Sequence, residues 1–476
     1  MSNNVENQQI ETDCSGVEPT TVDIVNQKNG KNINSKNSNN DNLKNLNDMN
    51  QKNTKIENSK KIVKSKCEQV ENNRNCVMTT DAMVVCGIKT KRIKGHIIAK
   101  VVFCLVFAAI AICFSLISLK GAQWSEKIVR NVTFVWVGIF GRISAAIPFS
   151  VFELSCFLLI ILFLSLIVAM IVFMSKRKSL KAFNHLCTIA VVTLGIFAMY
   201  SATTSVAYGR EPLDIPFADN AIITNDSVKN FAVNYYKDYY DNIQTIQKDY
   251  VNKKGESKCP YTFEELTEKI RAEYQKLPKG YFPNYIPTAK KMISSWFMSQ
   301  FSILGVTFTP YGEANINKDA PMDEVAHTIA HELAHTLGVM REYDANNLAS
   351  YVLLNSSDPY LKYVGFGSTN AANNLIDYSN NSKFGIAEKN KYNKIKVTVV
   401  EKDKLRSIKF WRQNNKFEKI GSFFNDIYLK MQGQGDGVNS YYKPSQGEVV
   451  TMPDGEKVYS NIVYSDACRM MFALYD

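Results

Sequence analysis

Three of the five histidines in this 476-residue chain lie in one short segment, AHTIAHELAHTLG, at residues 326–338. His331 and His335 are spaced i, i+4, which places both imidazoles on one face of a helix, close enough to bind one metal ion. Glu332 directly follows the first of them. In the HExxH pattern of zinc hydrolases this carboxylate is the general base toward a zinc-bound water. The spacing predicts a catalytic zinc site in which His331 and His335 are ligands and Glu332 is the base.

A catalytic zinc ion takes three protein ligands and keeps one position open. Residues 210–476 contain no histidine outside this segment, so the third ligand is a carboxylate, a cysteine or His327. Three ligands on one straight helix cannot easily surround a tetrahedral ion, so we expect His327 to pack beside the site or support it. Glu342 begins the next predicted helix and is the preferred third ligand, and Asp344 is the alternative.

The elements around these residues must bring a carboxylate back to the histidines. Gly338 comes three residues after His335 and is a natural helix stop that lets the chain turn back. Glu342 then follows after a short turn. Asn346 lies one helical turn beyond Glu342, and we expect its side-chain oxygen to accept the free N–H of a ligating histidine.

Two other segments are candidates for contact with a substrate. Val306–Pro310 alternates like a strand shortly before the site helix, and it is either a substrate-binding edge strand or an ordinary core strand. Tyr441 follows the glycine-rich turn at 433–437. It is either a donor to a developing oxyanion or a packed surface tyrosine.

Elsewhere in residues 210–476 the patterns are weaker. Residues 226–300 are dominated by helical patterning, and the alternation in Lys394–Val400 predicts a strand. Cys259 and Cys468 are the two cysteines of this region. In an exported domain they would either pair as a disulfide or stay free.

The composition changes twice along the chain. Residues 1–95 are rich in Asn and Lys with no sustained apolar period, which predicts a disordered tail. Residues 96–208 form a predicted membrane region with three transmembrane helices, because three stretches are uncharged and long enough to cross a bilayer: 101–119, 154–175 and 186–206. The apolar segment 131–140 is short and lies between two arginines, so we expect it at the membrane interface.

Basic residues predict how this region is oriented. Nine basic residues lie either before the first span or in the loop between the second and third spans, which are on the same side of the membrane. Five lie on the opposite side, between the first and second spans or after the third. With three spans, this bias predicts a multi-pass protein of the cytoplasmic membrane with a cytoplasmic N-terminus and an extracytoplasmic C-terminal domain, residues 210–476. The net charge of +11 falls on residues 1–208, and 210–476 is balanced. The predicted partners are therefore the lipid bilayer and a peptide or protein substrate, and no nucleic acid is expected.

The segment HELAHTLGVMREYDAN resembles the gluzincin branch of the zincin metalloproteases, in which HExxH is completed by a glutamate on a following helix. The chain also resembles an uncharacterised bacterial membrane-protein family, domain-of-unknown-function family 3810, over roughly residues 97–445. The matching pieces are the site helix and Ile147–Glu153, Gly305–Asn315, Asp358–Gly365, Asn425–Lys430 and Gly435–Tyr441. Asn346 stands where many gluzincins have aspartate, and Glu342 follows His335 more closely than in several gluzincin families.

The combined expectation is an α-helical membrane region with three transmembrane helices and a mainly α, α+β zincin-like extracytoplasmic domain. Its expected function is that of a membrane-anchored zinc-dependent peptidase. The alternative is a non-enzymatic cell-envelope protein in which the HExxH helix is structural or binds a structural metal.

Overall fold

The computed structural model describes residues 80–211, 213 and 222–475. The chain divides into two units, Met1–Val85 and Cys86–Asp476, and the site lies in the second. In the membrane region the helices are α2 (Thr80–Lys120), α3 (Ala122–Ile128), η1 (Val129–Thr133), α4 (Phe134–Ala145), α5 (Val151–Ser175), α6 (Ser179–Thr203) and η2 (Ser205–Gly209).

Most of the remaining elements are also helices. The strands are β1 (Thr288–Lys291), β2 (Gly305–Phe308), β3 (Glu313–Ile316), β4 (Gln446–Thr451) and β5 (Lys457–Val463). The helices are α8 (Asn225–Asp249), α9 (Phe263–Tyr274), α10 (Ser295–Gln300), η3 (Thr309–Tyr311), α11 (Met322–Thr336), α12 (Glu342–Leu354), α13 (Pro359–Gly367), α14 (Ala371–Tyr378), α15 (Ser382–Asn390), α16 (Thr398–Asn414), α17 (Glu418–Met431), η4 (Gly437–Tyr441) and α18 (Asp466–Tyr475).

The structure contains one more candidate span than the three transmembrane helices that the sequence predicted. In the described part of the chain, four helical stretches are long and apolar enough to cross a membrane: 92–120, 122–145, 151–175 and 179–209. The additional stretch, 122–145, contains the segment that we expected at the interface. Its mean hydropathy of 1.2 is the lowest of the four. The sequence places its apolar core between arginines, but the continuous helix through α3, η1 and α4 extends it to spanning length.

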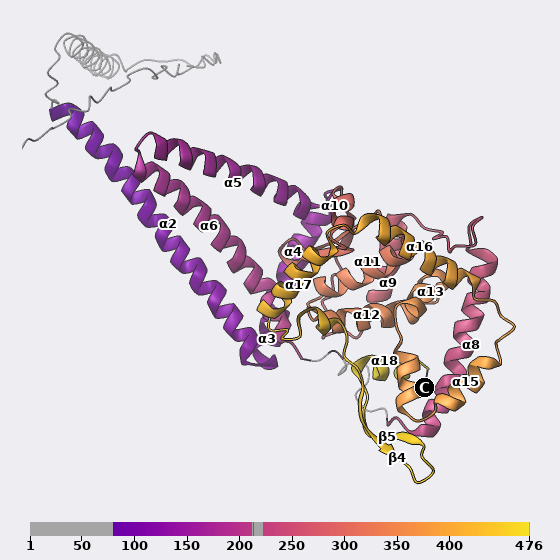
Figure 1. Ribbon diagram of the computed structural model, residues 1–476. Coiled ribbons are helices and arrows are strands. Elements are labelled where there is room, and N and C mark those ends of the chain that lie inside the picture. Colours follow the sequence, from indigo (N-terminus) through magenta and orange to yellow (C-terminus); the bar gives the residue numbers. More distant parts are fainter. Residues whose placement is uncertain (1–79, 212, 214–221, 476) are drawn as a thin grey trace, which may run out of the picture. The chain divides into compact units, whose positions relative to one another are not determined.

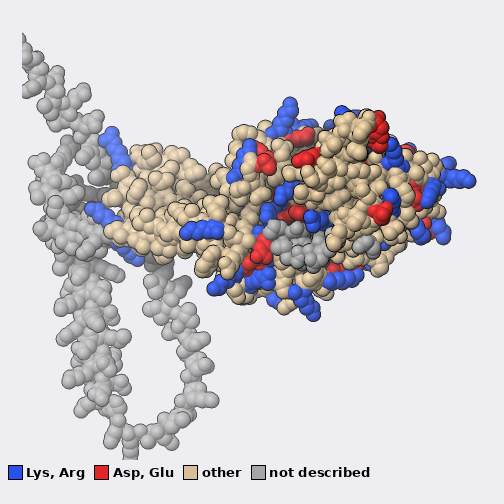
Figure 2. Space-filling view, turned by 90° about the horizontal axis from the view of Figure 1, so that it is seen from below, with Lys and Arg blue, Asp and Glu red and all other residues tan. Residues whose placement is uncertain are grey.

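Three of these helices, α2, α5 and α6, extend away from the helical domain that holds the site (Figure 1). The Nζ of Lys100 on α2 donates to Asn184 Oδ1 at 3.0 Å and to Thr188 Oγ1 at 2.7 Å on α6. The middle of α2 therefore lies beside the N-terminal half of α6. Along most of their length the surface carries few charges (Figure 2).

The stretch 122–145 instead packs on the domain. The Trp136 Nε1–H donates to the carbonyl oxygen of Pro310 at 2.9 Å, and Arg130 Nη1 donates to that of Gly280 at 2.7 Å. Gly141 faces Gly312, and a Cβ on Gly312 would lie 2.8 Å from the Gly141 backbone. The two backbone segments can approach this closely only because both residues are glycines.

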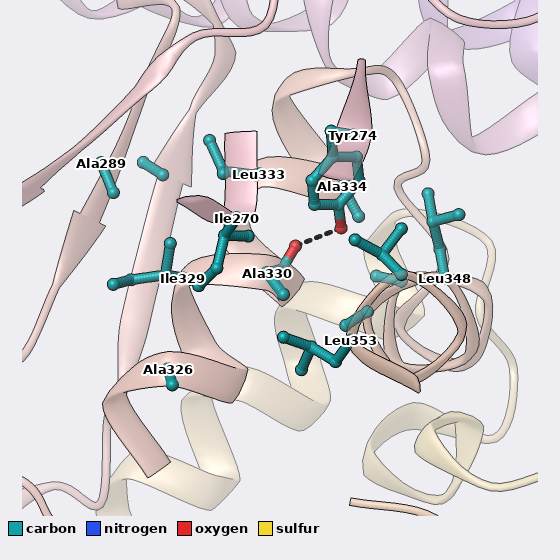
Figure 3. Packing of buried hydrophobic residues seen from close by; sticks show 14 of the residues in the cluster. Ile270, Tyr274, Ala289, Ala326, Ile329, Ala330, Leu333, Ala334, Leu348 and Leu353 are labelled. Carbon is teal, nitrogen blue, oxygen red and sulfur yellow. Dashed lines mark hydrogen bonds between the residues drawn. The ribbon is translucent and has the colours of Figure 1, made fainter. Parts of the chain in front are cut away.

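Helix α11 runs through the centre of the main hydrophobic core (Figure 3). Its small and branched apolar side chains Ala326, Ile329, Ala330 and Leu333 are fully buried. The Tyr274 hydroxyl of α9 donates to the Ala330 carbonyl oxygen at 2.5 Å, which fixes the middle of the helix. A three-stranded sheet, in the order β1-β3-β2, covers α11; β3 is parallel to β1 and antiparallel to β2.

A buried ion pair joins the sheet to the membrane helices. The Nζ of Lys290 on β1 lies 3.0 Å from Glu313 Oε2 on β3 and also donates to the Ser144 carbonyl oxygen at 2.6 Å. Glu313 is fully buried and accepts from the Phe152 N–H of α5 at 2.7 Å. The sheet and the junction of α4 with α5 therefore form one packed unit.

Lys290→Met is expected to destabilise the full-length protein by about 3–5 kcal/mol, because it leaves the Glu313 carboxylate buried without its counter-ion. The adjacent residue supplies the control. Lys291 pairs with Glu264 at the surface, and Lys291→Met should cost at most about 1 kcal/mol. Denaturant unfolding in detergent measures both, and equal losses would contradict the structural role of the buried pair.

Several sequence predictions need correction. Helix α2 begins at Thr80, so the predicted disordered tail is wrong for 80–95, and its remainder, 1–79, lies outside the described residues. Residues 394–397 form no strand, and α16 begins at Thr398, because this segment packs beside α8 rather than in a sheet. The region 226–300 is helical in α8, α9 and α10, and β1 interrupts it.

Cys259 and Cys468 are both free. Cys259 packs against the core around α11, whereas Cys468 is buried in a second hydrophobic cluster formed by α8, α14 and α18. The disulfide that we considered possible is therefore not formed, because the two thiols belong to different clusters.

Candidate metal centre

The end of α11 places the two histidines and turns the chain back. Gly338 has φ 80°, a left-handed conformation that favours glycine. The Val339 N–H donates to the Ala334 carbonyl oxygen at 3.1 Å across this turn. The chain then enters α12 at Glu342, as the position of Gly338 predicted.

Three potential ligand atoms meet in this turn. The Nε2 atoms of His331 and His335 are 3.0 Å apart. Glu342 Oε2 lies 3.1 Å from Nε2 of His331 and 3.5 Å from Nε2 of His335. These residues form the single group in the described part of the chain whose ligand atoms lie close enough together to hold a metal ion, and all three are buried.

The distances suit a zinc ion. Ligands at about 2.0–2.1 Å in a tetrahedron lie roughly 3.3–3.4 Å from one another, close to the three separations here. Glu342 Oε2 is buried, and among the described residues no donor reaches it with hydrogen-bond geometry, although both imidazole Nε2 atoms lie within 3.5 Å. A buried carboxylate oxygen without a donor is costly unless a cation compensates it. Two imidazoles and one carboxylate are also the donor set of many catalytic zinc sites.

The charges of the site favour the same conclusion. Burial disfavours the charged imidazole of His335, but the Glu342 carboxylate outweighs it and raises the pKa of His335 to about 9. Burial likewise opposes ionisation of Glu342, and His335 and His331 overcome it and lower the pKa of Glu342 well below its ordinary range. Glu342 therefore carries a negative charge, and a divalent cation would take the place of a proton between these groups.

The orientation of the His335 ring comes from the main chain. Its Nδ1–H donates to the Val339 carbonyl oxygen at 2.7 Å, which leaves Nε2 free to bind a metal. His331 Nδ1 is buried without a partner among the described residues. Asn346 lines the same cavity. The hydrogen bond that we predicted from a ligating histidine to the Asn346 side chain is not formed by His331 or by His335. The Val339 carbonyl performs this role for His335, because the turn at Gly338 points it inward.

The two alternative ligands lie outside the group. Asp344 forms an ion pair with Arg341 Nε at 2.7 Å. His327 lies half-buried one turn before His331, and their ring centroids are 6.4 Å apart. Burial, with the nearby His331, lowers the pKa of His327 to about 3. His327 is therefore neutral and packs beside the site.

Glu332 lies beside the three ligands and is held by the edge strand. The Thr307 hydroxyl of β2 donates to Glu332 Oε2 at 2.8 Å. Burial raises the pKa of Glu332 above its ordinary value, although the charges of His335 and His331 oppose the rise. A raised carboxyl pKa suits a group that takes and returns a proton near neutral pH.

Gly305 makes room for the Glu332 carboxylate. A Cβ at this position would lie 2.6 Å from Glu332 Oε1 and 2.8 Å from its Cδ. We expect Gly305→Ala to displace the carboxylate and lower any hydrolytic rate by at least about tenfold, while zinc stays bound, since a displacement near 1 Å can cost about 10²-fold. Gly367→Ala, at a helix end where a Cβ meets no atom within 4 Å, is the control. Equal rates in both variants would contradict this role of Gly305.

A cavity of about 1000 Å³ opens in front of the site. The domain lines it with α10, α11, the segment from Ile303 to Thr307, and α17. The membrane region contributes Phe152, Thr204 and Tyr208. Strand β2 has one partner, β3, and is therefore an edge strand, and its residues Gly305, Val306 and Thr307 line the cavity. The predicted strand over 306–310 is thus present at a sheet edge, but it ends at Phe308, and Pro310 belongs to η3.

Tyrosines gather on the far side of Glu342. Tyr441 lines the cavity and lies near Asn425, whose Nδ2 is 3.3 Å from its hydroxyl. Desolvation, with the charge of Glu342, raises the pKa of Tyr441 above its ordinary range, so it remains a protonated donor. The Tyr428 hydroxyl lies within hydrogen-bond distance of Tyr200 and 3.1 Å from that of Tyr208.

Sequence reasoning missed Gly305, Thr307 and this tyrosine group around Tyr428. The alternation of residues 306–310 placed a strand before the site helix but did not show which side chain touches Glu332. Tyr200 and Tyr208 were assigned to the membrane region, and no local pattern linked them to the site.

Comparison with known proteins identifies the family. A family model described as "Protein of unknown function (DUF3810)" matches residues 129–444. The matched range includes α5, α6, the sheet and every residue of the site described above. No curated protein and no solved structure matches the chain. The family model covers well over half of the sequence, and the chain therefore belongs to the DUF3810 family of proteins of unknown function.

Proposed function

We propose that the chain is a membrane-anchored zinc-dependent peptidase. The observation that carries this proposal is the buried group of His331, His335 and Glu342, with Glu332 beside it at the floor of a cavity that borders an edge strand. We also infer that the domain is zincin-like and of the gluzincin type, because the third ligand is a glutamate on the helix that follows HExxH.

In this proposal His331, His335 and Glu342 hold the zinc ion. Bound zinc would polarise a peptide carbonyl and lower the pKa of a water molecule beside it. Glu332 takes a proton from the attacking water, whose oxygen forms a bond to the carbonyl carbon. Glu332 then returns that proton to the leaving nitrogen as the C–N bond breaks. Thr307 keeps the carboxylate of Glu332 in place for both transfers.

The other residues of the cavity position a substrate. The edge of β2 would pair with the substrate backbone by strand addition. The hydroxyl of Tyr441 would donate to the oxygen that gains charge during attack. Asn346 would contact the substrate or the ring of His331 after side-chain rotation.

We propose that the domain lies outside the cytoplasmic membrane and that the N-terminus is cytoplasmic. Support comes from the basic residues, which gather in the N-terminal half of α2 and at the loop between α5 and α6. The Lys100 contacts place α2 beside α6, close to the helix end that this loop precedes. The stretch 122–145 packs on the domain through Trp136 and Gly141. In this arrangement α2, α5 and α6 cross the bilayer and 122–145 lies at its surface.

Metal removal tests the proposal. The full-length protein, purified in detergent and incubated with a broad peptide library, is expected to cleave peptides with one zinc per chain. A chelator should stop cleavage, and added zinc should restore it. Mass spectrometry of the library and elemental analysis of the protein measure the two quantities. Zinc binding without cleavage of any peptide would favour a structural metal in a non-enzymatic envelope protein.

A further inference from the structure

Helix α17 turns its apolar side chains outward. Residues spaced for one helical face are between 40 and 71% exposed: Ile420, Phe423, Phe424, Ile427 and Met431. Leu429 is the one buried residue of this helix. A helix on the surface of a soluble domain normally packs such a stripe into the core. An exposed apolar stripe of this size indicates that something covers it.

Helix α10 and the residues before it extend the stripe. Ile293, Trp296 and Phe297 are 76, 65 and 56% exposed. The Phe417 N–H donates to the Gln300 carbonyl oxygen at 2.7 Å, which joins the end of α10 to the start of α17. We call the exposed apolar residues of both helices the α10–α17 patch; its members are Ile293, Trp296, Phe297, Ile420, Phe423, Phe424, Ile427 and Met431.

The patch is attached to the ends of the helices that could span a membrane. The Glu153 carboxylate, in the first turn of α5, accepts the Ile293 and Ser294 N–H groups at 2.8 and 2.6 Å. At the other end of the patch, Tyr428 of α17 contacts Tyr200 of α6 and Tyr208 of η2. The exposed apolar surface of α5 starts at Leu154, next to Glu153. The patch therefore continues the apolar surface of the membrane helices.

We propose that the α10–α17 patch rests in the lipid–water interface of the bilayer, so that the cavity of the metal centre opens at the membrane surface. Its aromatic residues suit that interface, where Trp and Phe accumulate on the apolar face of amphipathic helices. Lys416 and Lys419, both exposed beside the patch, supply cations for anionic headgroups.

The position of α17 connects the patch with the site. Gly421, Ser422 and Asn425 of this helix line the cavity, and Phe424 belongs to both the patch and the lining. One helix therefore separates lipid from the metal centre. The substrate class that follows is a peptide held at the membrane surface by a lipid or a transmembrane anchor; this part rests on the proposed peptidase function.

Trp296 reports directly on the patch. The full-length chain, with Trp124, Trp136 and Trp411 replaced by Phe, is placed in nanodiscs of phosphatidylcholine and phosphatidylglycerol whose acyl chains carry bromine at different depths. We expect Trp296 emission to be quenched most by bromines about 5–10 Å below the headgroups. In the control protein Trp411 is instead the single tryptophan, and its indole N–H donates to Glu324 inside the domain. If quenching of Trp296 is no greater than that of Trp411, the patch does not touch lipid.

A difference measurement covers the case in which the triple replacement unfolds the protein. Trp296→Phe in the otherwise unchanged chain should remove a brominated-lipid-sensitive component of the emission. Phe423→Asp should weaken that component, whereas Val449→Asp, on the exposed strand β4, should not. Shielding of Trp296 from an aqueous quencher without quenching by lipid would mean that a protein, such as a second copy, covers the patch, and would overturn the proposal.

A matched pair of peptides tests the substrate class. One peptide of the library is offered to the nanodisc-bound protein with and without an acyl chain at one end. The acylated form should be cleaved faster, and Ile427→Asp should reduce the ratio of the two rates. Equal rates would overturn the substrate class. Failure to cleave either peptide, with Trp296 quenched by lipid, would contradict the peptidase function and leave the membrane seating intact.

Discussion

Glu332→Gln is expected to lower peptide hydrolysis by about 10²–10⁴-fold, the usual contribution of a general base. The amide keeps nearly the same shape and can still contact Thr307, but it cannot take a proton from water. Zinc content should stay at one ion per chain, because the three ligand atoms belong to other residues. Steady-state rates on the best library peptide and elemental analysis of the same sample measure both effects.

The matched control for this variant lies on the same helix. Glu324 is partly buried and accepts a hydrogen bond from Trp411 at 2.9 Å, away from the ligands. Glu324→Gln should keep both the rate and the zinc. Full activity of Glu332→Gln would remove Glu332 from the mechanism, and loss of zinc in that variant would mean that it acts on the metal instead.

Glu342→Gln is expected to abolish tight zinc binding and, with it, hydrolysis. The substitution removes the one anionic ligand. The resulting decrease in zinc affinity should exceed the roughly 10–100-fold decrease that follows loss of a residue that only orients a ligand. The neighbouring carboxylate provides the control. Asp344 pairs with Arg341, so Asp344→Asn should keep zinc, with a small cost in stability.

Competition with a chromophoric chelator measures the two affinities on full-length protein. Equal zinc affinity in wild type and Glu342→Gln would show that the third ligand is a different group. Loss of zinc in Asp344→Asn alone would transfer the ligand role to Asp344, the alternative that the sequence left open.

Much of the site follows from local sequence rules. The i, i+4 spacing puts His331 and His335 on one face, and Gly338 ends the helix so that Glu342 can return after a short turn. These features depend on a few neighbouring residues and on main-chain geometry. The fold class was predictable to the same extent: a mostly helical chain with apolar helices of spanning length.

The remainder depends on packing between distant segments. Glu332 requires the space above Gly305, and the tyrosines beside Glu342 come from α6, η2, α17 and η4. The outward face of α17 has the same period as an ordinary buried face, so its direction cannot be inferred from spacing. The candidate span 122–145 was not predicted because its apolar core is short, whereas the continuous helix around that core has spanning length.

The association of the membrane helices with the site also changes how the protein should be studied. Arg210 connects the two parts: its Nε lies 2.8 Å from Glu126 Oε1 on α3, and its Nη1 donates to the carbonyl oxygen of Leu337 at the end of α11 at 3.3 Å. A fragment that begins at residue 210 would lack Glu126 and also Phe152, which forms part of the cavity wall. Experiments on the metal centre therefore need the full-length chain.

The central claim is that His331, His335 and Glu342 hold a zinc ion. X-ray absorption at the zinc edge of the full-length protein tests it most directly. We expect one zinc per chain with nitrogen and oxygen neighbours at about 2.0–2.2 Å, two of them imidazoles, and no sulfur. A protein that binds no zinc after loading, or one whose zinc spectrum shows sulfur ligands at about 2.3 Å, would contradict the claim.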